Sequence, residues 1–336
     1  MNRFVKSLAA ALPPSLLLSS FPFEVGAQEA LEPVVVTATR QQTRVSEILA
    51  DVTVIEREEI ERAGGETVVD LLARQPGIQM TRNGGPGTSA SLFVRGTRPD
   101  QTKVLVDGVP INSLDLAGSP LRFLSLADVD RIEILRGPAS TLYGADAIGG
   151  VIQIFTRRGA PGLSVDAFAG YGSYDTAQGS AGLSVGNELV RLRADFQQSY
   201  SGGFSAMKNA SGQDADDDAY RNRGGTASLV LTPLAGHEMG FVLRQNQGRA
   251  HYDEIPPTSQ FNDYEEFRTQ QWQVYTRNAL TDAWTSTLRI GHALDWHKYV
   301  SSWPSRMRTE NDEYSWQNDV APVSYTHLTL PTIYSV

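Results

Sequence analysis

Long stretches after residue 160 alternate between apolar and polar side chains. Residues 190–197 read Val-Arg-Leu-Arg-Ala-Asp-Phe-Gln, residues 239–243 repeat the pattern, and the segment from Trp284 to Trp296 extends it furthest. Successive side chains of a β-strand point to opposite faces, so this period of two predicts strands with one mostly apolar face.

The segment from Trp284 to Trp296 has the length of a membrane crossing. At ~3.3 Å per residue and a tilt of about 40°, it rises roughly 30 Å, close to the apolar band of a bilayer with aromatic residues at both edges. A soluble β-sandwich also alternates, but it does not require tryptophans at this spacing. The pattern therefore favours a transmembrane antiparallel β-barrel.

The polar segments between these stretches are of two lengths. Residues 180–182 and 280–283 predict short turns, whereas residues 201–223 and 248–268 predict long loops. Outer-membrane barrels have short periplasmic turns and long outer loops. At ~20 residues per strand and turn, residues 161–322 supply about eight strands, the first part of such a barrel.

Residues 41–160 have a different texture that predicts an α+β domain. A helical pattern over residues 56–73 is interrupted at Gly64 and Gly65, and Thr67 and Asp70 have the spacing of a capping box for a second helix. Apolar runs with glycine-rich turns follow, including a predicted hairpin at Asp107-Gly108.

Composition and charge narrow the function classes. The 336 residues carry a formal charge of -9 and contain no cysteine, which argues against a nucleic-acid partner and against thiolate chemistry. Residues 1–27 combine Arg3 and Lys6 with an apolar run and a small-residue site ending at Ala27, which predicts a cleavable signal peptide. No later stretch is apolar for long enough to form a transmembrane helix.

Several motifs between residues 93 and 154 occur in a fixed order. They are Phe93-Val-Arg95-Gly96, then Lys103-Val-Leu-Val-Asp107-Gly108, then Arg131-Ile-Glu133-Ile-Leu-Arg136-Gly137-Pro138 with Gly149-Gly150 after it. Together they resemble the plug domain of TonB-dependent outer-membrane receptors. The resemblance implies a plug at residues 41–160 inside a barrel of 22 strands when complete, so that this chain looks like an N-terminal fragment.

The resemblance also covers a periplasmic segment at residues 28–40. Within it, a short β-branched run resembles a TonB box: Pro33, Val34, Val35, Val36, Thr37, Ala38 and Thr39. An exposed extended segment can add a strand to the sheet edge of a TonB-type energy-transducing partner. The alternative interpretation is an ordinary first strand.

Within the family the motifs look most similar to the vitamin B12 (cobalamin) receptor branch. The resemblance assigns substrate contacts to two loops, at Asn83, Gly84, Gly85 and Ser89 and at Thr97, Arg98 and Asp100. Apart from the resemblance, the glycines of these loops need only make turns. The implied function is TonB-dependent active transport of cobalamin or a related corrinoid across the bacterial outer membrane, driven by the inner-membrane proton gradient.

Acidic residues in the two long loops are a candidate metal site. In cobalamin receptors, aspartates of neighbouring outer loops bind calcium, and the matching positions here are Asp216, Asp218, Asp253 and Asp263. Carboxylate oxygens are the ligands that calcium prefers. A solvated acidic loop without any metal is the alternative. An EF-hand is excluded because Ala219 stands where that loop needs glycine.

Charged and glycine residues of the plug motifs are expected to hold the plug together. We expect Arg95, Arg131, Glu133 and Arg136 to form ion pairs, either within the plug or to the barrel wall, and Gly96 and Gly137 to form turns. Polar contacts would release a movable plug more readily than an apolar interface.

Other functions have less support in the sequence. The histidines have no metal-binding spacing and no nucleophile motif is present, so no enzyme is predicted. A ferric-siderophore receptor of the same family is the first alternative, and a surface binding or adhesion protein without transport is an alternative from another class. Residues 323–336 break the preceding pattern and look like a non-native tail.

Overall fold

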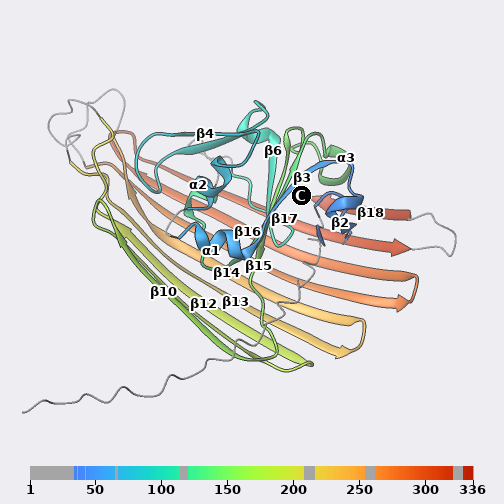
Figure 1. Cartoon of the computed structure of the whole chain (residues 1–336). Helices are drawn as coiled ribbons and strands as arrows, with labels where there is room; N and C mark the ends of the chain where they lie inside the picture. Colours follow the sequence, from blue (N-terminus) through green and yellow to red (C-terminus); the bar gives the residue numbers. More distant parts are fainter. Residues whose placement is uncertain are drawn as a thin grey trace, which may run out of the picture. The chain divides into compact units, whose positions relative to one another are not determined.

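The chain after Thr156 forms one large sheet, and the chain before it forms a smaller α+β domain (Figure 1). The computed structural model describes residues 34–35, 37–41, 43–64, 67–113, 120–207, 216–253, 262–320 and 328–335. The predicted signal peptide, together with Pro33 and Val36 of the predicted TonB box, lies outside the described residues.

The large sheet is antiparallel, and its strands pair in chain order. Its strands are β10 (Gly162–Gly172), β11 (Thr176–Gly186), β12 (Val190–Ser201), β13 (Tyr220–Leu234), β14 (His237–His251), β15 (Tyr264–Thr281), β16 (Trp284–Val300), β17 (Ser305–Val320) and β18 (Leu328–Ser335). The strands up to β17 confirm the expected eight within residues 161–322. The backbone of β18 pairs with β17, and the non-native origin of residues 323–336 stays a prediction.

The connections define two ends of the large sheet. Short turns join β11 to β12, β13 to β14 and β15 to β16 at the short-turn end, and residues 202–219 and 252–263 connect strands at the opposite, long-loop end. The predicted turn at residues 280–283 is confirmed. The predicted loops were too wide, because β13 already begins at Tyr220 and β14 continues to His251.

The predicted turn at residues 180–182 was wrong, since these residues lie within β11. Arg193 pairs with both Asp166 and Asp195 across the inner face of the sheet. A Cβ atom on Gly182 would lie 2.6 Å from a carboxylate oxygen of each aspartate. The small residue makes room for this ion cluster, and so it does not mark a turn.

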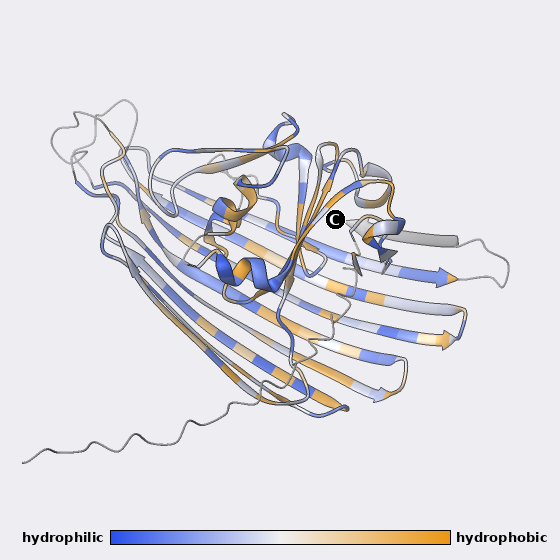
Figure 2. Cartoon of the chain, viewed as in Figure 1, coloured by the Kyte–Doolittle hydropathy of each residue, from blue (hydrophilic) through white to orange (hydrophobic). Residues whose placement is uncertain are grey.

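The outer face of the large sheet carries a continuous apolar belt. One row of paired positions crosses the strands from β10 to β17, and its members are Leu163, Val185, Leu192, Leu229, Phe241, Val274, Ile290 and Tyr314. All but the half-buried Leu229 are exposed. The alternating colours along the strands in Figure 2 follow this pattern.

The opposite face of the large sheet is polar and buried. Its buried side chains include Arg193, Asn222, Arg244, Asn246 and Gln273. Soluble domains bury apolar residues and expose polar ones, so the distribution here is inverted. The sandwich alternative is therefore wrong, and the sheet is part of a β-barrel. None of the helices in the described ranges is long and apolar enough to cross a membrane.

The N-terminal domain (residues 43–156) is built on a five-stranded sheet in the order β3-β8-β9-β6-β7. These strands are β3 (Asp51–Ile55), β8 (Val129–Arg136), β9 (Gly150–Thr156), β6 (Thr102–Val106) and β7 (Val109–Pro110). A hairpin of β4 (Ile78–Arg82) and β5 (Ala90–Val94) extends from it. The other elements are β1 (Val34–Val35) before the domain, β2 (Thr43–Arg44), α1 (Arg57–Arg62), α2 (Val68–Ala73), α3 (Ser140–Tyr143), and the short 3-10 helices η1 (Val45–Glu47), η2 (Pro99–Gln101) and η3 (Pro120–Phe123).

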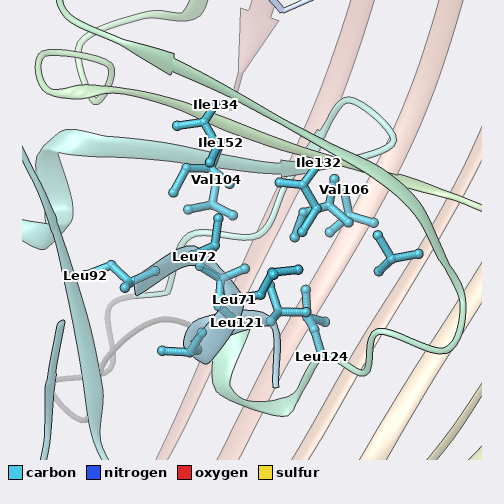
Figure 3. Close-up of a cluster of buried hydrophobic side chains, with 14 of the residues drawn as sticks. Leu71, Leu72, Leu92, Val104, Val106, Leu121, Leu124, Ile132, Ile134 and Ile152 are labelled. Carbon is cyan, nitrogen blue, oxygen red and sulfur yellow. The ribbon is translucent and has the colours of Figure 1, made fainter. Parts of the chain in front are cut away.

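An apolar core holds this domain together. Leu71 and Leu72 of α2 pack against strand residues that include Ile132, Ile134 and Ile152 (Figure 3). The predicted capping box is present, because Thr67 Oγ1 accepts from the Asp70 backbone N–H and Asp70 accepts from the Thr67 backbone N–H. The predicted hairpin is also present, with Asp107 and Gly108 both at positive φ between β6 and β7.

Arginine substitutions on the outer face test whether the apolar belt contacts lipid. Phe241→Arg places a charge at the middle of the belt, and we expect it to lower the free energy of unfolding from bilayers by about 2–4 kcal/mol. His237→Arg is the matched control, because it lies on the same strand and face at the short-turn end, beside the polar Asn278, where the cost should be about 0–1 kcal/mol. Equal costs in denaturant titrations would contradict a lipid-facing belt.

Candidate functional site

The segment of the predicted TonB box is docked on the N-terminal domain. Val35 of β1 pairs with Thr43 of β2, and the side chains of Val35 and Thr37 are fully buried. The backbone N–H and Oγ1 of Thr37 donate to Glu133 Oε2 at 2.8 and 2.6 Å. The expectation of an exposed extended segment is therefore wrong for the described residues. Their role as a TonB box stays a prediction.

Three further contacts hold this segment in place. Tyr143 Oη donates to the Thr37 carbonyl oxygen at 2.9 Å, and burial raises the pKa of Tyr143 to about 12, so the hydroxyl remains a donor at neutral pH. The Arg40 guanidinium lies 4.4 Å above the Tyr143 ring. Gln317 of β17 donates to the Arg40 carbonyl oxygen at 2.7 Å, which places the segment at the short-turn end of the large sheet.

The predicted structural charges form their ion pairs inside the N-terminal domain. Arg95 and Arg136 both pair with Asp51, and Arg131 Nε lies 3.0 Å from Glu133 Oε1. Arg131 thus neutralises the carboxylate that holds Thr37. The turn expected at Gly96 and Gly137 is present, since both glycines have positive φ. The ion pairs of these charged residues with Asp51 and with each other all lie within the N-terminal domain.

Other residues, which sequence reasoning missed, connect the domain to the large sheet. Arg122 Nη2 of η3 pairs with Glu265 Oε1 at 2.8 Å, and both side chains are buried. Next to them, the ring of Phe123 stacks on Phe267 with centroids 3.6 Å apart. Asp128 pairs with Arg244 in a second buried contact. The interface therefore combines an aromatic contact with buried ion pairs of residues that were not predicted, and no local motif distinguishes these residues.

A cavity of about 370 Å³ separates the domain from the inner faces of β10 to β13. Pro86 of the first predicted substrate loop lies on its wall, together with Ser201 and Tyr220 at the long-loop end. Hydroxyl and amide side chains are the largest group in its lining and include Thr67, Gln178, Ser180, Gln197, Ser199 and Asn222. Three basic and three acidic side chains also line it, so its charges balance, and its size is in the range of small-molecule sites.

The structure separates the two predicted substrate loops. A Cβ atom on Gly84 would lie 3.3 Å from Ala206, and one on Gly85 would lie 3.7 Å from Phe204, so the loop with Asn83 and Ser89 reaches the long-loop end. At Gly87, with φ +79°, a Cβ atom would lie only 2.2 Å from the Tyr220 ring. The backbone of this loop can approach the sheet only because glycine occupies that position.

The second predicted loop interacts mainly with itself. Thr97 Oγ1 donates to the Val94 carbonyl oxygen at 2.7 Å and packs beside Gly149. Arg98 and Asp100 are exposed and pair with each other. A substrate contact by these residues stays a prediction.

The acidic positions at the long-loop end are only partly brought together. Asp218 Oδ2 accepts from the Ala206 N–H and Asp253 Oδ2 accepts from the Met207 N–H, both at 3.2 Å, whereas Asp216 accepts from Asn262. Burial raises the pKa of Asp218 to about 7, with a further contribution from Asp253. Within the part of the chain that the structure describes, no three acidic or histidine side chains are arranged to hold a metal. Calcium binding at Asp216, Asp218, Asp253 and Asp263 stays a prediction.

A comparison with known families finds a match in the N-terminal domain. Residues 44–151 match the family model of the TonB-dependent Receptor Plug Domain, and we call the N-terminal domain the plug domain from here on. The match covers the motifs at Arg95-Gly96, Asp107-Gly108 and Arg131–Gly150 on which the resemblance rested.

Solved structures match the plug domain and the large sheet together. The ferric yersiniabactin uptake receptor FyuA of Yersinia pestis superposes with a TM-score of 0.69 at 23% identity, over 85% of this chain and 48% of its own. The ferripyoverdine receptor of the outer membrane of Pseudomonas aeruginosa gives 0.73 at 17%, over 90% and 44%. The siderophore receptor PirA of Acinetobacter baumannii gives 0.69 at 18%, over 89% and 48%. The chain thus has the fold of these proteins and spans about half of their length.

A single introduced cysteine tests the docking of the N-terminal segment. The chain has no native cysteine, so Val35→Cys supplies one buried thiol. Thr37→Val removes the Oγ1 donor to Glu133, a charge-assisted bond of about 1.5–3 kcal/mol, and we expect maleimide labelling of that thiol to accelerate roughly 10-fold or more.

Thr37→Ser is the control for this labelling, because it keeps the hydroxyl that donates to Glu133 Oε2. It should leave the labelling rate nearly unchanged. A parent Val35→Cys protein that reacts as fast as an unfolded peptide would show that the segment is not docked in solution.

The raised pKa of Asp218 predicts a pH dependence at the long-loop end. The folded carboxyl keeps its proton up to a pH of about 7, whereas the unfolded one loses it near its ordinary value of 3.8, so stability should fall as the pH rises between these values. With chelator present, the protection factor of the Ala206 amide, which is its intrinsic exchange rate at each pH divided by the observed rate, should fall from pH 5 to pH 8.

Asp218→Asn should abolish this dependence, and Asp282→Asn at the short-turn end should retain it. Calcium at millimolar concentration should suppress the loss of protection if the aspartates bind it. A protection factor that is independent of pH in the parent protein would show that Asp218 is ordinarily ionised.

Proposed function

We propose that this chain belongs to an outer-membrane receptor that takes up a small molecule by active transport. The observation that carries the proposal is the inverted large sheet, with its apolar belt outside and a polar face turned toward a plug domain. A lipid environment accounts for the belt, and a barrel closes the hydrogen bonds of its backbone. The predicted signal peptide agrees with export to that membrane.

A ferric siderophore is the first candidate for the cargo. The solved structures that match over most of this chain are named as receptors for siderophores or their ferric complexes. The loop motifs that favoured cobalamin leave it as the second candidate. Either cargo would first meet the long-loop end, where Pro86 lines the cavity.

The proposed mechanism uses opposite ends of the plug domain. Cargo enters at the long-loop end, and a TonB-type partner engages residues 33–39 at the short-turn end, using the inner-membrane proton gradient. A pull there first breaks the bonds of Thr37 to Glu133 and of Tyr143 to Thr37. The buried contacts of Arg122 and Asp128 with the large sheet lie further along the chain and resist longer.

Uptake assays test this proposal in cells that lack their own siderophore and cobalamin receptors. Cells producing the protein are given iron-55 as ferric yersiniabactin or ferripyoverdine, or radiolabelled cyanocobalamin. We expect iron uptake well above background for one of the chelates. Deletion of residues 33–39 should abolish uptake and leave surface binding unchanged.

The same deletion distinguishes transport from adhesion. A surface binding protein without transport would bind a ligand equally with or without residues 33–39, and no label would enter the cell in either case. Entry of cyanocobalamin without iron would assign the cargo to the corrinoid class instead.

A further inference from the structure

A second cavity, of about 460 Å³, lies at the short-turn end. Arg40 and Gln41 of the N-terminal segment form one side of it, and the plug sheet contributes Gly108, Gln153 and Phe155. The inner faces of β14 to β17 form the rest. Its volume is within the range of small-molecule sites, and nothing in the proposed entry path uses it.

Five arginines and four acidic residues line this cavity. Its basic lining residues are Arg40, Arg131, Arg158, Arg277 and Arg289, and its acidic ones are Asp130, Glu238, Glu313 and Asp319. Three of these acids already have partners: Asp130 Oδ2 lies 3.8 Å from Arg131 Nη1, Glu238 pairs with Arg191 outside the lining and accepts from Tyr275, and Asp319 accepts from Gln41 and Gln317. Glu313 forms no direct ion pair in the described part of the chain, but it interacts electrostatically with Arg40 and Arg289.

Three of the arginines have no ion-pair partner in the described part of the chain, namely Arg40, Arg277 and Arg289. The Nε atoms of Arg40 and Arg289 are buried and lack any hydrogen-bond partner among the described residues. Arg289 lies against Gly108, where a Cβ atom would be 2.4 Å from Nη1. Buried donors without partners are costly, and an anion would satisfy them.

We propose that this cavity is a binding site for an oxyanion, of the carboxylate or phosphate class. A second step rests on the proposed function: the anion is a carboxylate of the cargo, an iron chelate that binds here before it leaves the receptor. A guanidinium binds a carboxylate through two parallel hydrogen bonds, so two or three free arginines select an anionic cargo over a neutral one.

The N-terminal segment couples this site to the energy-transducing partner. Arg40 follows Thr37 and Thr39 in the same docked segment, and its carbonyl oxygen is held by Gln317. Withdrawal of the segment removes Arg40 from the cavity and leaves Arg277 and Arg289. One movement therefore opens the cavity on one side and weakens its hold on the anion.

Citrate and inorganic phosphate are the probes for the site. Calorimetric titration of the protein in detergent at low salt should detect binding of at least one of them. The double variant Arg277→Gln, Arg289→Gln should weaken that binding at least 10-fold. Arg308→Gln is the matched control, since Arg308 is exposed on β17 near the long-loop end and pairs with Glu310. It should leave binding unchanged.

A second variant separates a lost charge from a lost fold. Arg289→Lys keeps the charge and should retain part of the citrate affinity, whereas equal losses in the Lys and Gln variants would overturn the proposal. Absence of binding by either anion in the parent protein would also overturn it, as would binding that ignores both cavity substitutions.

Uptake measurements test the assignment of the anion to the cargo. Arg289→Gln should slow iron uptake and leave chelate binding at the cell surface unchanged. Loss of citrate binding with unchanged uptake would show that the bound anion is not the cargo. If no chelate is taken up by the parent protein but citrate binding depends on Arg277 and Arg289, the proposed function fails and the anion site stands.

Discussion

The inversion of polarity across one sheet determines the rest of this structure. A sheet with its apolar residues on the outside needs an apolar surrounding instead of water. Its polar inner face needs hydrogen-bond and ion-pair partners. The apolar row from Leu163 to Tyr314 meets the first need. The plug domain meets the second, because Arg122, Asp128 and backbone carbonyls such as that of Val106 satisfy polar groups of the inner face.

The interface between plug domain and large sheet is mostly polar for the same reason. The inner face offers mainly charges and amides, so the apolar core around Leu72 and Ile132 is formed almost entirely by the plug domain's own residues, with Ala293 of β16 as a member from the large sheet. A second apolar contact is the stacked pair of Phe123 and Phe267 beside the buried pair of Arg122 and Glu265. Contacts of this kind fix the position of the domain without making the whole interface apolar.

The sequence predicted the features that depend on local pattern. The period of two in residues 190–197 and 284–296 indicated strands with an apolar outer face, and Thr67 with Asp70 indicated a capped helix. The order of the glycine and arginine motifs indicated the plug domain. Each of these follows from neighbouring residues, whose spacing is visible in a single chain.

Features that depend on contacts between distant residues were not predictable in this way. Gly182 suggested a turn from its local sequence alone. The ion cluster that requires a glycine there is formed by Asp166, Arg193 and Asp195 on other strands, so the local sequence does not reveal it. The burial of Thr37 depends on Glu133, 96 positions away. The cavity at the short-turn end brings together Arg40, Arg277 and Arg289, and no single segment of the chain contains enough of its lining residues to form a motif.

The pairing of β1 with β2 has a consequence for the kinetics of any partner that recognises this segment. A partner strand that takes the place of Thr43 beside Val35 needs this segment to undock first, so recognition of that kind is a strand exchange that begins from a minor population. If the free form makes up ~1% of molecules, the apparent affinity falls about 100-fold. Molecules with a docked segment would then seldom bind a partner that is present in few copies. Any event that loosens the segment would act as a signal that recruits this partner.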